Sequence, residues 1–376
     1  MFKRQLYSGQ SFGHPRPIRT WLYTHRKVVI PGAIAAFFLV GAGGAFAYNH
    51  FTKKPSTTPT PPAKVTAKAP TPAAPPKYFS PLSGVEVSKD QSERPITGVM
   101  IENSPDARPQ SGLIDAGVVF EAIAEGGITR FLTFFEEGQP QTLGPVRSLR
   151  IYYVNWLGAF DAPIAHVGGS AKALETVRGA GFKDIDQFFN GGAYWRASDR
   201  YAPHNVYTSF AKLDELNKAK GYYKAPKDTK FQAFQRKSDA PSTTPNAAKI
   251  QVSISSALYN SSYTYDKGTN SYLRSQAGEG HIDRESKQQL HPKVVVVMKI
   301  PQVVVLEDGY RESIQVIGQG DGWVFQDGTV KHVQWRKDSP TAQITFKDDD
   351  NQLLKFNAGQ TWLTAIPTTQ TVGWQP

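Results

Sequence analysis

Two glutamates and an arginine lie close together in a stretch whose pattern predicts a β-hairpin. Glu121 and Glu125 precede a Gly-Gly pair at 126–127, and Arg130 follows it. Because Gly-Gly favours a two-residue turn and side chains alternate along a strand, we expect Glu121, Glu125 and Arg130 to share one sheet face. Two carboxylates beside a cation could act as general acid and base, or could form a cross-strand ion pair. Glu121, Glu125 and, further along, His204 are therefore the candidate catalytic residues.

A second polar group follows a Gly-Pro dipeptide. Arg147 and Arg150 lie three residues apart on either side of Ser148, so they would share one face of the helix expected over 148–157. Guanidinium groups at a helix N-terminus suit a carboxylate or phosphate ligand, but they could equally pair with acids of the chain itself.

A strand-like run over 164–167 contains His166 and is followed by Gly168, Gly169 and Ser170, before a stretch with helical periodicity. This order lets backbone N–H groups face an anion. The alternatives are that Ser170 only caps the helix and that His166 is a hydrogen-bonded core residue.

A polar and aromatic loop of about 20 residues comes next, and loops of this length in compact domains are often functional. It carries residue types that often contact ligands. With this loop included, the expected ligand-binding residues are Arg130, Arg147, Ser148, Arg150, His166, Gly168, Gly169, Ser170, Tyr194, Trp195, Arg196, His204 and Asn205.

No metal site or cofactor is expected from the sequence. The eight histidines show no His-x-x-x-His spacing, and the chain has no cysteine. The acidic run 348–351 lacks the glycine and the glutamate that an EF-hand loop needs at its sixth and twelfth positions. The absence of cysteine also excludes a thiol nucleophile and a lipid-modified cysteine.

The elements that would position these residues belong to an exported protein. From 28 to 48 the chain has no charged residue, which at about 1.5 Å per residue is long enough for a transmembrane helix. Basic residues before this segment place a tail, 1–27, in the cytoplasm and the bulk of the chain outside. The small residues Ala45 and Ala47 leave open a signal peptide that is cleaved instead of an uncleaved anchor.

The positive charge of the chain belongs to this N-terminal part. The net charge is +11, but residues 1–77 hold eleven basic residues and no acidic one, so the remainder is formally neutral. The linker over 49–79 is rich in Pro, Thr and Ala and is expected to stay extended. A neutral ectodomain with local arginine clusters favours a discrete site and argues against nucleic acid as a partner.

Two ectodomains are expected, with an α+β fold overall. Residues 80–237 mix strands such as 96–103, 116–123 and 128–135 with helices over 170–180 and 209–220, which is an α/β pattern. Residues 250–376 contain many short strands separated by Asp/Gly turns, which predicts a mostly antiparallel sandwich or barrel.

The order of motifs resembles the YerB-like lipoproteins, the DUF3048 family of unknown function. The resemblance covers about 80–376 and rests on segments that include Glu102-Asn103-Ser104, Arg108 to Leu113, Glu125 to Arg130, Gly144 to Ser148, His166 to Ser170, Ala202 to Asn205 and Gly359 to Trp362. It implies a two-part envelope protein and no particular reaction. Lipoproteins are tethered through a lipidated cysteine, so here the resemblance implies that the helix 28–48 replaces that anchor.

Three functions follow from these observations. The first is a single-pass, membrane-tethered, non-catalytic binder of a cell-wall polymer or of an envelope glycan or peptide ligand, held in a cleft lined by Arg and His. The second is an enzyme acting on envelope glycans or phosphodiesters, with Glu121 or Glu125 as acid/base. The third is an adaptor that docks a membrane protein on its C-terminal β-rich part.

Overall fold

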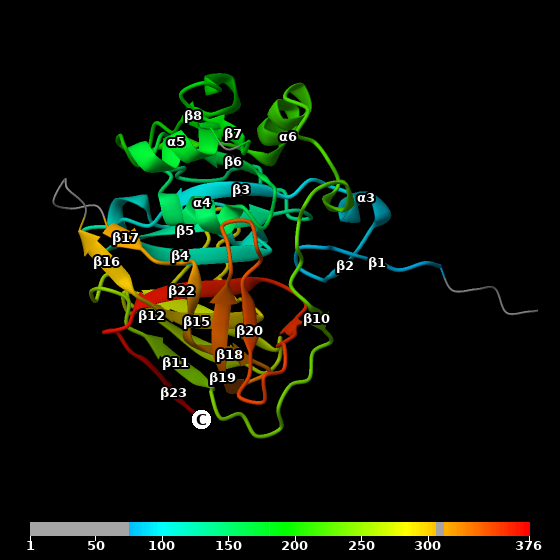
Figure 1. Ribbon diagram of the computed structural model, residues 1–376, viewed down its shortest axis with the longest axis vertical. Coiled ribbons are helices and arrows are strands. Elements are labelled where there is room, and N and C mark those ends of the chain that lie inside the picture. Colours follow the sequence, from blue (N-terminus) through cyan, green and yellow to red (C-terminus); the bar gives the residue numbers. More distant parts are fainter. Residues whose placement is uncertain (1–74, 180, 306–311) are drawn as a thin grey trace, which may run out of the picture. The chain divides into compact units, whose positions relative to one another are not determined.

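A twisted ten-stranded sheet runs through the whole folded part of the chain (Figure 1). The computed structural model describes residues 75–179, 181–305 and 312–376. The predicted cytoplasmic tail, the helix 28–48 and most of the predicted linker lie outside the described residues. Among the helices of the described ranges, none combines the length and apolar character needed to cross a bilayer.

The ten strands include both halves of the predicted ectodomain. In spatial order they are β20 (Thr345–Lys347), β19 (Thr329–Lys337), β18 (Gly318–Gln326), β15 (Val294–Ile300), β22 (Thr361–Pro367), β4 (Val118–Glu125), β5 (Ile128–Phe135), β3 (Thr97–Glu102), β6 (Pro163–His166) and β7 (Lys183–Asp186). The expected hairpin 116–135 is present as β4 and β5, with β5 at the predicted bounds.

The two halves join through parallel strands. β22 pairs in parallel with β15 on one side and with β4 on the other. All seven residues of β22 are buried, which is typical of a central strand covered on both faces. The expectation of a mostly antiparallel C-terminal part therefore has an exception here, because this strand lies between the two halves.

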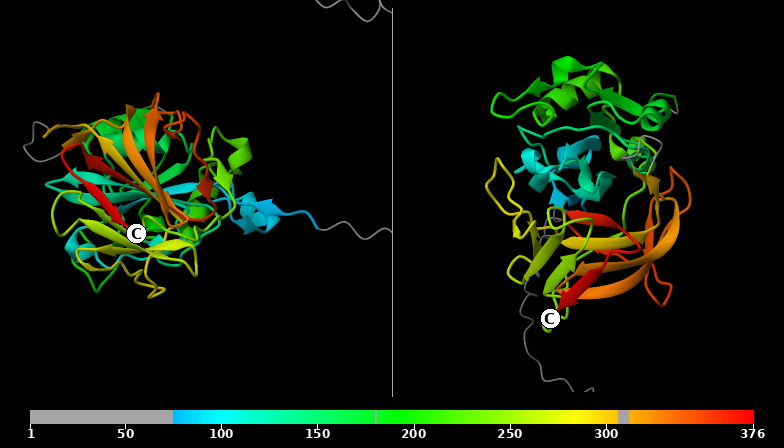
Figure 2. Two further views of the ribbon diagram at one scale, coloured as in Figure 1. Left: turned by 90° about the horizontal axis from the view of Figure 1, so that it is seen from below. Right: turned by 90° about the vertical axis from the view of Figure 1, so that its left-hand side faces the viewer.

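A second sheet has five antiparallel strands, which are β14 (Glu279–Gly280), β13 (Ser271–Gln276), β12 (Ser261–Asp266), β11 (Lys249–Val252) and β23 (Val372–Gln375). Figure 2 shows this sheet facing the β15–β18–β19 end of the large sheet. Its inward side chains, such as Ile250 and Tyr263, share one core with Val296 and Phe325. Two sheets thus enclose a common core in this region, although one of them continues into the N-terminal half.

Helices are few and cover the N-terminal half. They are α3 (Lys89–Ser92), α4 (Ile151–Leu157), α5 (Ala171–Gly179) and α6 (Phe210–Ala219), with 3-10 turns at Pro105–Ala107, Leu113–Asp115, Gly191–Ala193 and Pro226–Asp228. α6 begins where expected, because the Ser209 side chain accepts a hydrogen bond from the backbone N–H of Lys212. The fold is α/β, with many strands and few helices.

Small strand pairs complete the chain: β1 (Tyr78–Phe79) with β2 (Glu86–Val87), β8 (Trp195–Arg196) with β9 (Val206–Tyr207), β10 (Arg236–Lys237) with β21 (Phe356–Asn357), and β16 (Gln302–Val305) with β17 (Glu312–Ile314). The β1–β2 hairpin lies where the described chain begins, at the right of Figure 1. Tyr78 and Phe79, at the end of the predicted linker, are therefore part of the folded unit.

Candidate functional site

Most of the predicted site residues gather at one edge of the large sheet. β4, β3, β6 and β7 run in the same direction, so their C-terminal ends meet at this edge. In open α/β sheets this is the edge at which ligands bind. The β1–β2 hairpin precedes β3 and lies at the opposite side of the molecule (Figure 1). The candidate site therefore faces away from the point where the chain enters the fold.

A closed cluster of Glu125, Arg130 and Arg150 forms one part of this edge. Arg150 donates from Nη2 to both carboxylate oxygens of Glu125 at 2.8 and 2.6 Å, and from Nε at 2.9 Å. Arg130 donates to Glu125 Oε1 at 3.0 Å and to the carbonyl of Ser148 at 2.8 Å. All three side chains are at most 10% exposed. Two buried guanidinium groups thus share one carboxylate inside the protein.

The electrostatics of this cluster keep Glu125 ionised. Burial by itself raises the pKa of Glu125, but the charges and hydrogen bonds of Arg130 and Arg150 outweigh that effect and leave the pKa below its usual value. Burial, followed by the charge of Arg130, lowers the pKa of Arg150. A buried carboxylate held ionised by two arginines is not suited to donate a proton, which argues against Glu125 as a general acid.

Glu121 lies on the other face of the sheet, so the prediction of a shared face is wrong. Ala122, not Ile123, opposes Arg130, because the pairing of β4 and β5 shifts register between Ile123 and Glu125. The extra residue reverses the alternation of side chains at this point. A two-residue turn was expected and is present, but the bulge next to it could not be read from the sequence.

Glu121 is instead the centre of a buried network that crosses between the two halves. It accepts hydrogen bonds from Arg274 Nη2 at 3.0 and 3.2 Å and from Trp362 Nε1 at 2.9 Å. Glu121 and Arg274 are fully buried, and the Arg274 guanidinium lies 4.5 Å from the centre of the Trp362 ring. Burial lowers the pKa of Arg274, but the Glu121 carboxylate and the Tyr263 side chain together outweigh this effect and raise it. Glu121 therefore joins the two halves of the fold.

A half-exposed cluster occupies the end of β3. The Oε1 atom of Glu102 lies 3.0 Å from His204 Nδ1 and 3.3 Å from Arg147 Nε, and it accepts a hydrogen bond from Ser104 Oγ at 3.0 Å. Glu102 is buried, whereas the side chains of Arg147 and His204 are 25% and 22% exposed. Solvent therefore reaches a cation and an imidazole held over a buried carboxylate.

The arrangement of Ser104, His204 and Glu102 differs from a catalytic triad. Ser104 Oγ lies 3.2 Å from His204 Nδ1, the same nitrogen that contacts Glu102. In a triad the base and the orienting carboxylate use opposite ring nitrogens. His204 Nε2 is instead 3.9 Å from the exposed carboxylate of Asp106. This geometry holds the imidazole ring in place and does not activate Ser104.

Glu102 and Ser104 were not among the predicted site residues. They belong to the segment Glu102-Asn103-Ser104, which directly follows the buried run of β3. A carboxylate at the end of an otherwise apolar strand was the signal that could have identified them.

Arg147 and Arg150 do not share a helix face, because α4 begins at Ile151 with Arg150 as its N-cap residue. The preceding segment is extended, since Arg147 N–H donates to the Met100 carbonyl and Leu149 N–H to that of Gly168. These bonds lay the segment across the ends of β3 and β6. Arg147 consequently points to Glu102, while Arg150 points to Glu125.

The turn after β6 is tied to β7. His166 is fully buried and its two ring nitrogens lie 2.9 Å from Asp184 Oδ1 and 2.8 Å from the Gly168 carbonyl. The Gly168 N–H donates to Asp186 at 2.9 Å, and Ser170 N–H donates to the Leu149 carbonyl. Gly168 has φ +59°, which favours glycine. Gly169 pairs with Leu149 in an isolated bridge.

The expected aromatic loop is a hairpin formed by β8 and β9. Tyr194 is buried and its hydroxyl donates to the Ile185 carbonyl, while the Trp195 ring stacks on Tyr207 with centres 6.4 Å apart. Arg196 is exposed and donates to Asn205 Oδ1 at 2.7 Å. The loop between the strands brings His204 to Glu102.

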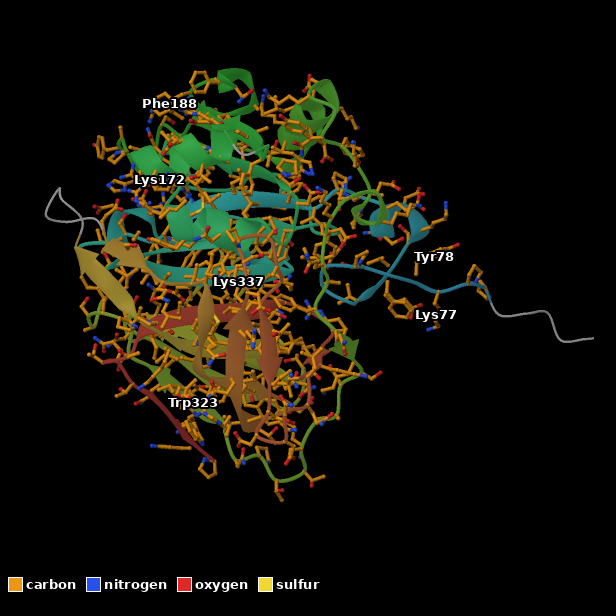
Figure 3. All side chains as sticks on the ribbon, viewed as in Figure 1. Lys77, Tyr78, Lys172, Phe188, Trp323 and Lys337 are labelled. Carbon is orange, nitrogen blue, oxygen red and sulfur yellow. The ribbon has the colours of Figure 1, made fainter. Side chains whose placement is uncertain are left out.

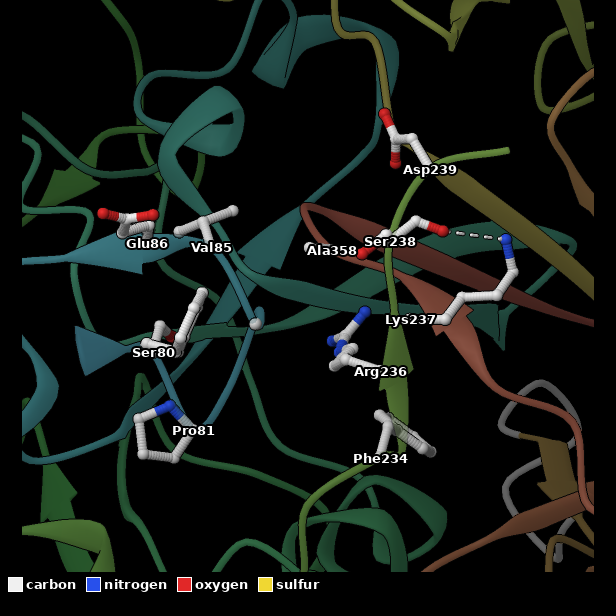
Figure 4. Close-up of a pocket in the computed structure, with 12 residues that line it drawn as sticks. Ser80, Pro81, Val85, Glu86, Phe234, Arg236, Lys237, Ser238, Asp239 and Ala358 are labelled. Atoms are coloured by element: carbon white, nitrogen blue, oxygen red, sulfur yellow. Dashed lines mark hydrogen bonds between the residues drawn. The ribbon is translucent and has the colours of Figure 1, made fainter. Parts of the chain in front are cut away.

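A cavity also lies in another part of the described chain, and none of the predicted site residues lines it. A cavity of about 760 Å³ lies between the β1–β2 hairpin and β10, lined by Val85, Phe234 and Arg236 among others (Figure 4). Within the described ranges, no three His, Asp or Glu side chains are grouped so that they could hold a metal ion.

Comparisons with known proteins identify the family. Residues 82–223 match the model described as "Protein of unknown function (DUF3048) N-terminal domain", and residues 250–363 match that of its C-terminal domain. A Bacillus subtilis (strain 168) protein named "Putative lipoprotein YerB" is 33% identical over 294 residues, which are 77% of this chain and 87% of that protein. The crystal structure of YerB from Bacillus subtilis superposes with a TM-score of 0.70 at 30% identity, covering 79% of this chain and all of that one.

Proposed function

The chain belongs to the YerB-like DUF3048 family, and from this premise we propose that it is a membrane-tethered, non-catalytic binder of an anionic cell-envelope ligand. A relative named as a lipoprotein supports an extracytoplasmic, membrane-associated location. This chain has no cysteine to carry a lipid, so the apolar segment 28–48 would be its anchor. The linker that follows would carry the folded unit away from the membrane surface.

The half-exposed Arg147 and His204 above buried Glu102 are the observation that carries this proposal. Arg147 is 25% exposed and contacts Glu102, which His204 and Ser104 also contact, so its guanidinium is held in place while part of it stays open to solvent. A guanidinium group can bind a carboxylate or phosphate with two parallel hydrogen bonds. The site lies at the C-terminal edge of the parallel strands, where ligands of α/β folds bind.

Binding without catalysis agrees best with the positions of the carboxylates. Glu121 is fully buried against Arg274, and Glu125 is closed off by Arg150. Neither could reach a substrate without breaking a buried ion pair, which costs about 3–5 kcal/mol. Glu102 is also buried and is shared among three partners.

The test is retention of the full-length protein, in detergent micelles, on purified cell-wall material. We expect Arg147→Ala to weaken retention about ten-fold or more, because a hydrogen bond to a charged group is worth about 1.5–3 kcal/mol. Arg336→Ala is the matched control, since its side chain is exposed and belongs to β19, away from the site. Arg150 is a poor choice for this test because its loss would leave Glu125 buried with fewer partners.

Wall degradation products are followed in the same samples. Retention that is lost in Arg147→Ala but kept in Arg336→Ala, with no products, supports a binder. Release of products by the wild type would move the assignment to an enzyme. Equal retention of the two variants would place the binding surface elsewhere.

A further inference from the structure

Exposed aromatic rings belong to two segments that contact the proposed anion site. Phe188 and Phe189 follow β7 and are 69% and 72% exposed, and Tyr201 in the β8–β9 loop is 91% exposed. Figure 3 shows Phe188 in the upper part of the view, near α5 and β7 as labelled in Figure 1. Phe188 and Phe189 are adjacent in the chain and both exposed, and neighbouring exposed apolar side chains can form an interaction surface.

Backbone contacts connect these rings to Arg147 and His204. A Cβ placed on Gly168 would lie 3.1 Å from the Phe188 ring, and the neighbouring Val167 N–H donates to the Arg147 carbonyl at 3.1 Å. On the other side, His204 N–H donates to the Tyr201 carbonyl at 2.9 Å. Phe188 is therefore connected to the segment that carries Arg147, and Tyr201 to the segment that carries His204.

The loop that carries Tyr201 also carries two arginines, the exposed Arg196 and the partly exposed Arg200. Arg200 donates to the carbonyls of Asp106 and Pro109 at 3.2 and 2.7 Å, and Arg196 donates to Asn205. In the described part of the chain neither arginine lies within 4.0 Å of a carboxylate, in contrast to Arg147, which shares Glu102. Two exposed acids lie nearby: Asp199, which precedes Arg200 in the loop and pairs with Arg284, and Asp106, so the two loop arginines are matched by two carboxylates.

The two acids near the other aromatic pair are held in contacts with Arg178 and His166. Arg178 bonds Asp186 at 2.8 Å and approaches Asp184 at 3.5 Å, and its guanidinium lies 4.9 Å from the Phe189 ring centre. Both acids also contact the turn after β6, Asp184 through His166. The edge therefore presents apolar ring faces together with the partly exposed guanidinium of Arg147.

We propose that the ligand of this edge is an acidic glycan, whose sugar rings stack on Phe188 and Tyr201 while a carboxylate binds Arg147 and His204. The inference rests on the proposed function and names the class of ligand for the same site. A sugar ring offers a C–H face that is attracted to the negative face of an aromatic ring, and acidic sugars carry the carboxylate beside that face. Side chains that are 69–91% exposed form a shallow surface, whereas small ligands are usually buried by 70–90% in a pocket. A repeating polymer suits such a surface because many weak contacts add up.

The experiment measures binding of defined probes to the full-length protein in detergent micelles. The probes are a hyaluronan hexasaccharide, which carries a carboxylate on alternate sugars, a neutral chitin hexasaccharide, and poly(glycerol phosphate). We expect the acidic hexasaccharide to bind at least ten-fold more tightly than the neutral one. Phe188→Ala and Tyr201→Ala should each weaken it about five-fold, from the loss of one stacked ring.

Phe79→Ala is the matched control, because Phe79 is 53% exposed and lies in β1 at the opposite side of the molecule. Binding weakened equally by Phe79→Ala and Phe188→Ala would overturn the stacking role. The substituted rings are exposed, so the melting temperature should stay within a few degrees of wild type.

The remaining outcomes separate this inference from the proposed function. Binding of poly(glycerol phosphate) through Arg147 with no binding of either hexasaccharide would overturn the glycan assignment and leave the anion binder standing. Retention of the protein on wall material could also be lost once protease has removed the proteins attached to the wall. That result would identify a protein partner and overturn the inference. No retention on wall material at all would refute the proposed function itself.

Discussion

Glu136 gives a prediction whose magnitude follows from the structure. Its carboxyl group is fully buried, accepts hydrogen bonds from Ser80 Oγ at 2.7 Å and Leu82 N–H at 2.8 Å, and lies beside Glu137, which shares Ser80. Burial raises the pKa of Glu136 to about 8, assisted by the charge of Glu137 and only partly opposed by the bonds from Ser80 and Leu82. The folded protein therefore keeps a proton that the unfolded chain releases near its usual value of 4.5.

The sign of the pH dependence follows directly. Between pH 4.5 and about 8 the unfolded state is ionised while the folded state is not, so the free energy of unfolding falls as the pH rises. Each pH unit in this window costs about 1.4 kcal/mol. Glu136→Gln replaces the acid by a neutral group of the same shape and removes this loss. Relative to wild type, the variant should gain about 2–3 kcal/mol between about pH 5.5 and about pH 7.5.

The assay is urea unfolding of wild type and Glu136→Gln at both pH values and at one ionic strength. Glu215→Gln is the control, because Glu215 is exposed on α6 and loses the same formal charge. The difference between variants cancels the titration of other groups. If Glu136→Gln and wild type lost stability in parallel over this range, the carboxyl would not be protonated in the fold and the reasoning would be refuted.

Two further predictions concern stability elsewhere in the fold. Glu125→Gln should destabilise the protein by about 3–5 kcal/mol in urea unfolding at neutral pH, because two buried guanidinium groups lose their counter-charge. This loss of stability should shrink as the pH falls below the usual glutamate range. A loss under about 1 kcal/mol at neutral pH would contradict the closed cluster. Gly158→Ala should lower the free energy of unfolding by about 1–3 kcal/mol, because the new Cβ would clash with the Pro340 carbonyl oxygen. Gly179→Ala is the control, since a Cβ there would have nothing within 4 Å, and its effect should be near zero. Thermal melts of the two variants beside wild type measure the difference.

The continuous sheet has a consequence for both halves of the ectodomain. β22 comes from the C-terminal end of the chain but lies between β4 and β15, and Trp362 within it bonds Glu121 of β4. The two family domains thus share a buried charge pair and a core strand. A change in the C-terminal half, such as loss of Arg274, should therefore affect the edge at which Glu102 and Arg147 lie.

Local structure was readable from the sequence where short-range physics decides it. Alternating apolar residues and a Gly-Gly turn predicted the β4–β5 hairpin, and the polar residue Ser209 marked the start of α6. The family resemblance was likewise carried by local motifs and is confirmed over both domains. The distribution of charge, with a basic N-terminal part and a neutral remainder, also needed no fold.

Only the tertiary structure decided which charges meet. One extra residue in β4 placed Glu121 and Glu125 on opposite faces, and nothing in the local sequence encodes that bulge. The partner of Glu121 is Arg274, 153 residues away, and that of Glu102 is His204, 102 residues away. Burial and pairing depend on such long-range contacts, because a side chain's solvent exposure and electrostatic environment are set by the segments packed around it. The sequence therefore determined the elements and the family, and the packing of the two halves determined which arginine remains open to a ligand.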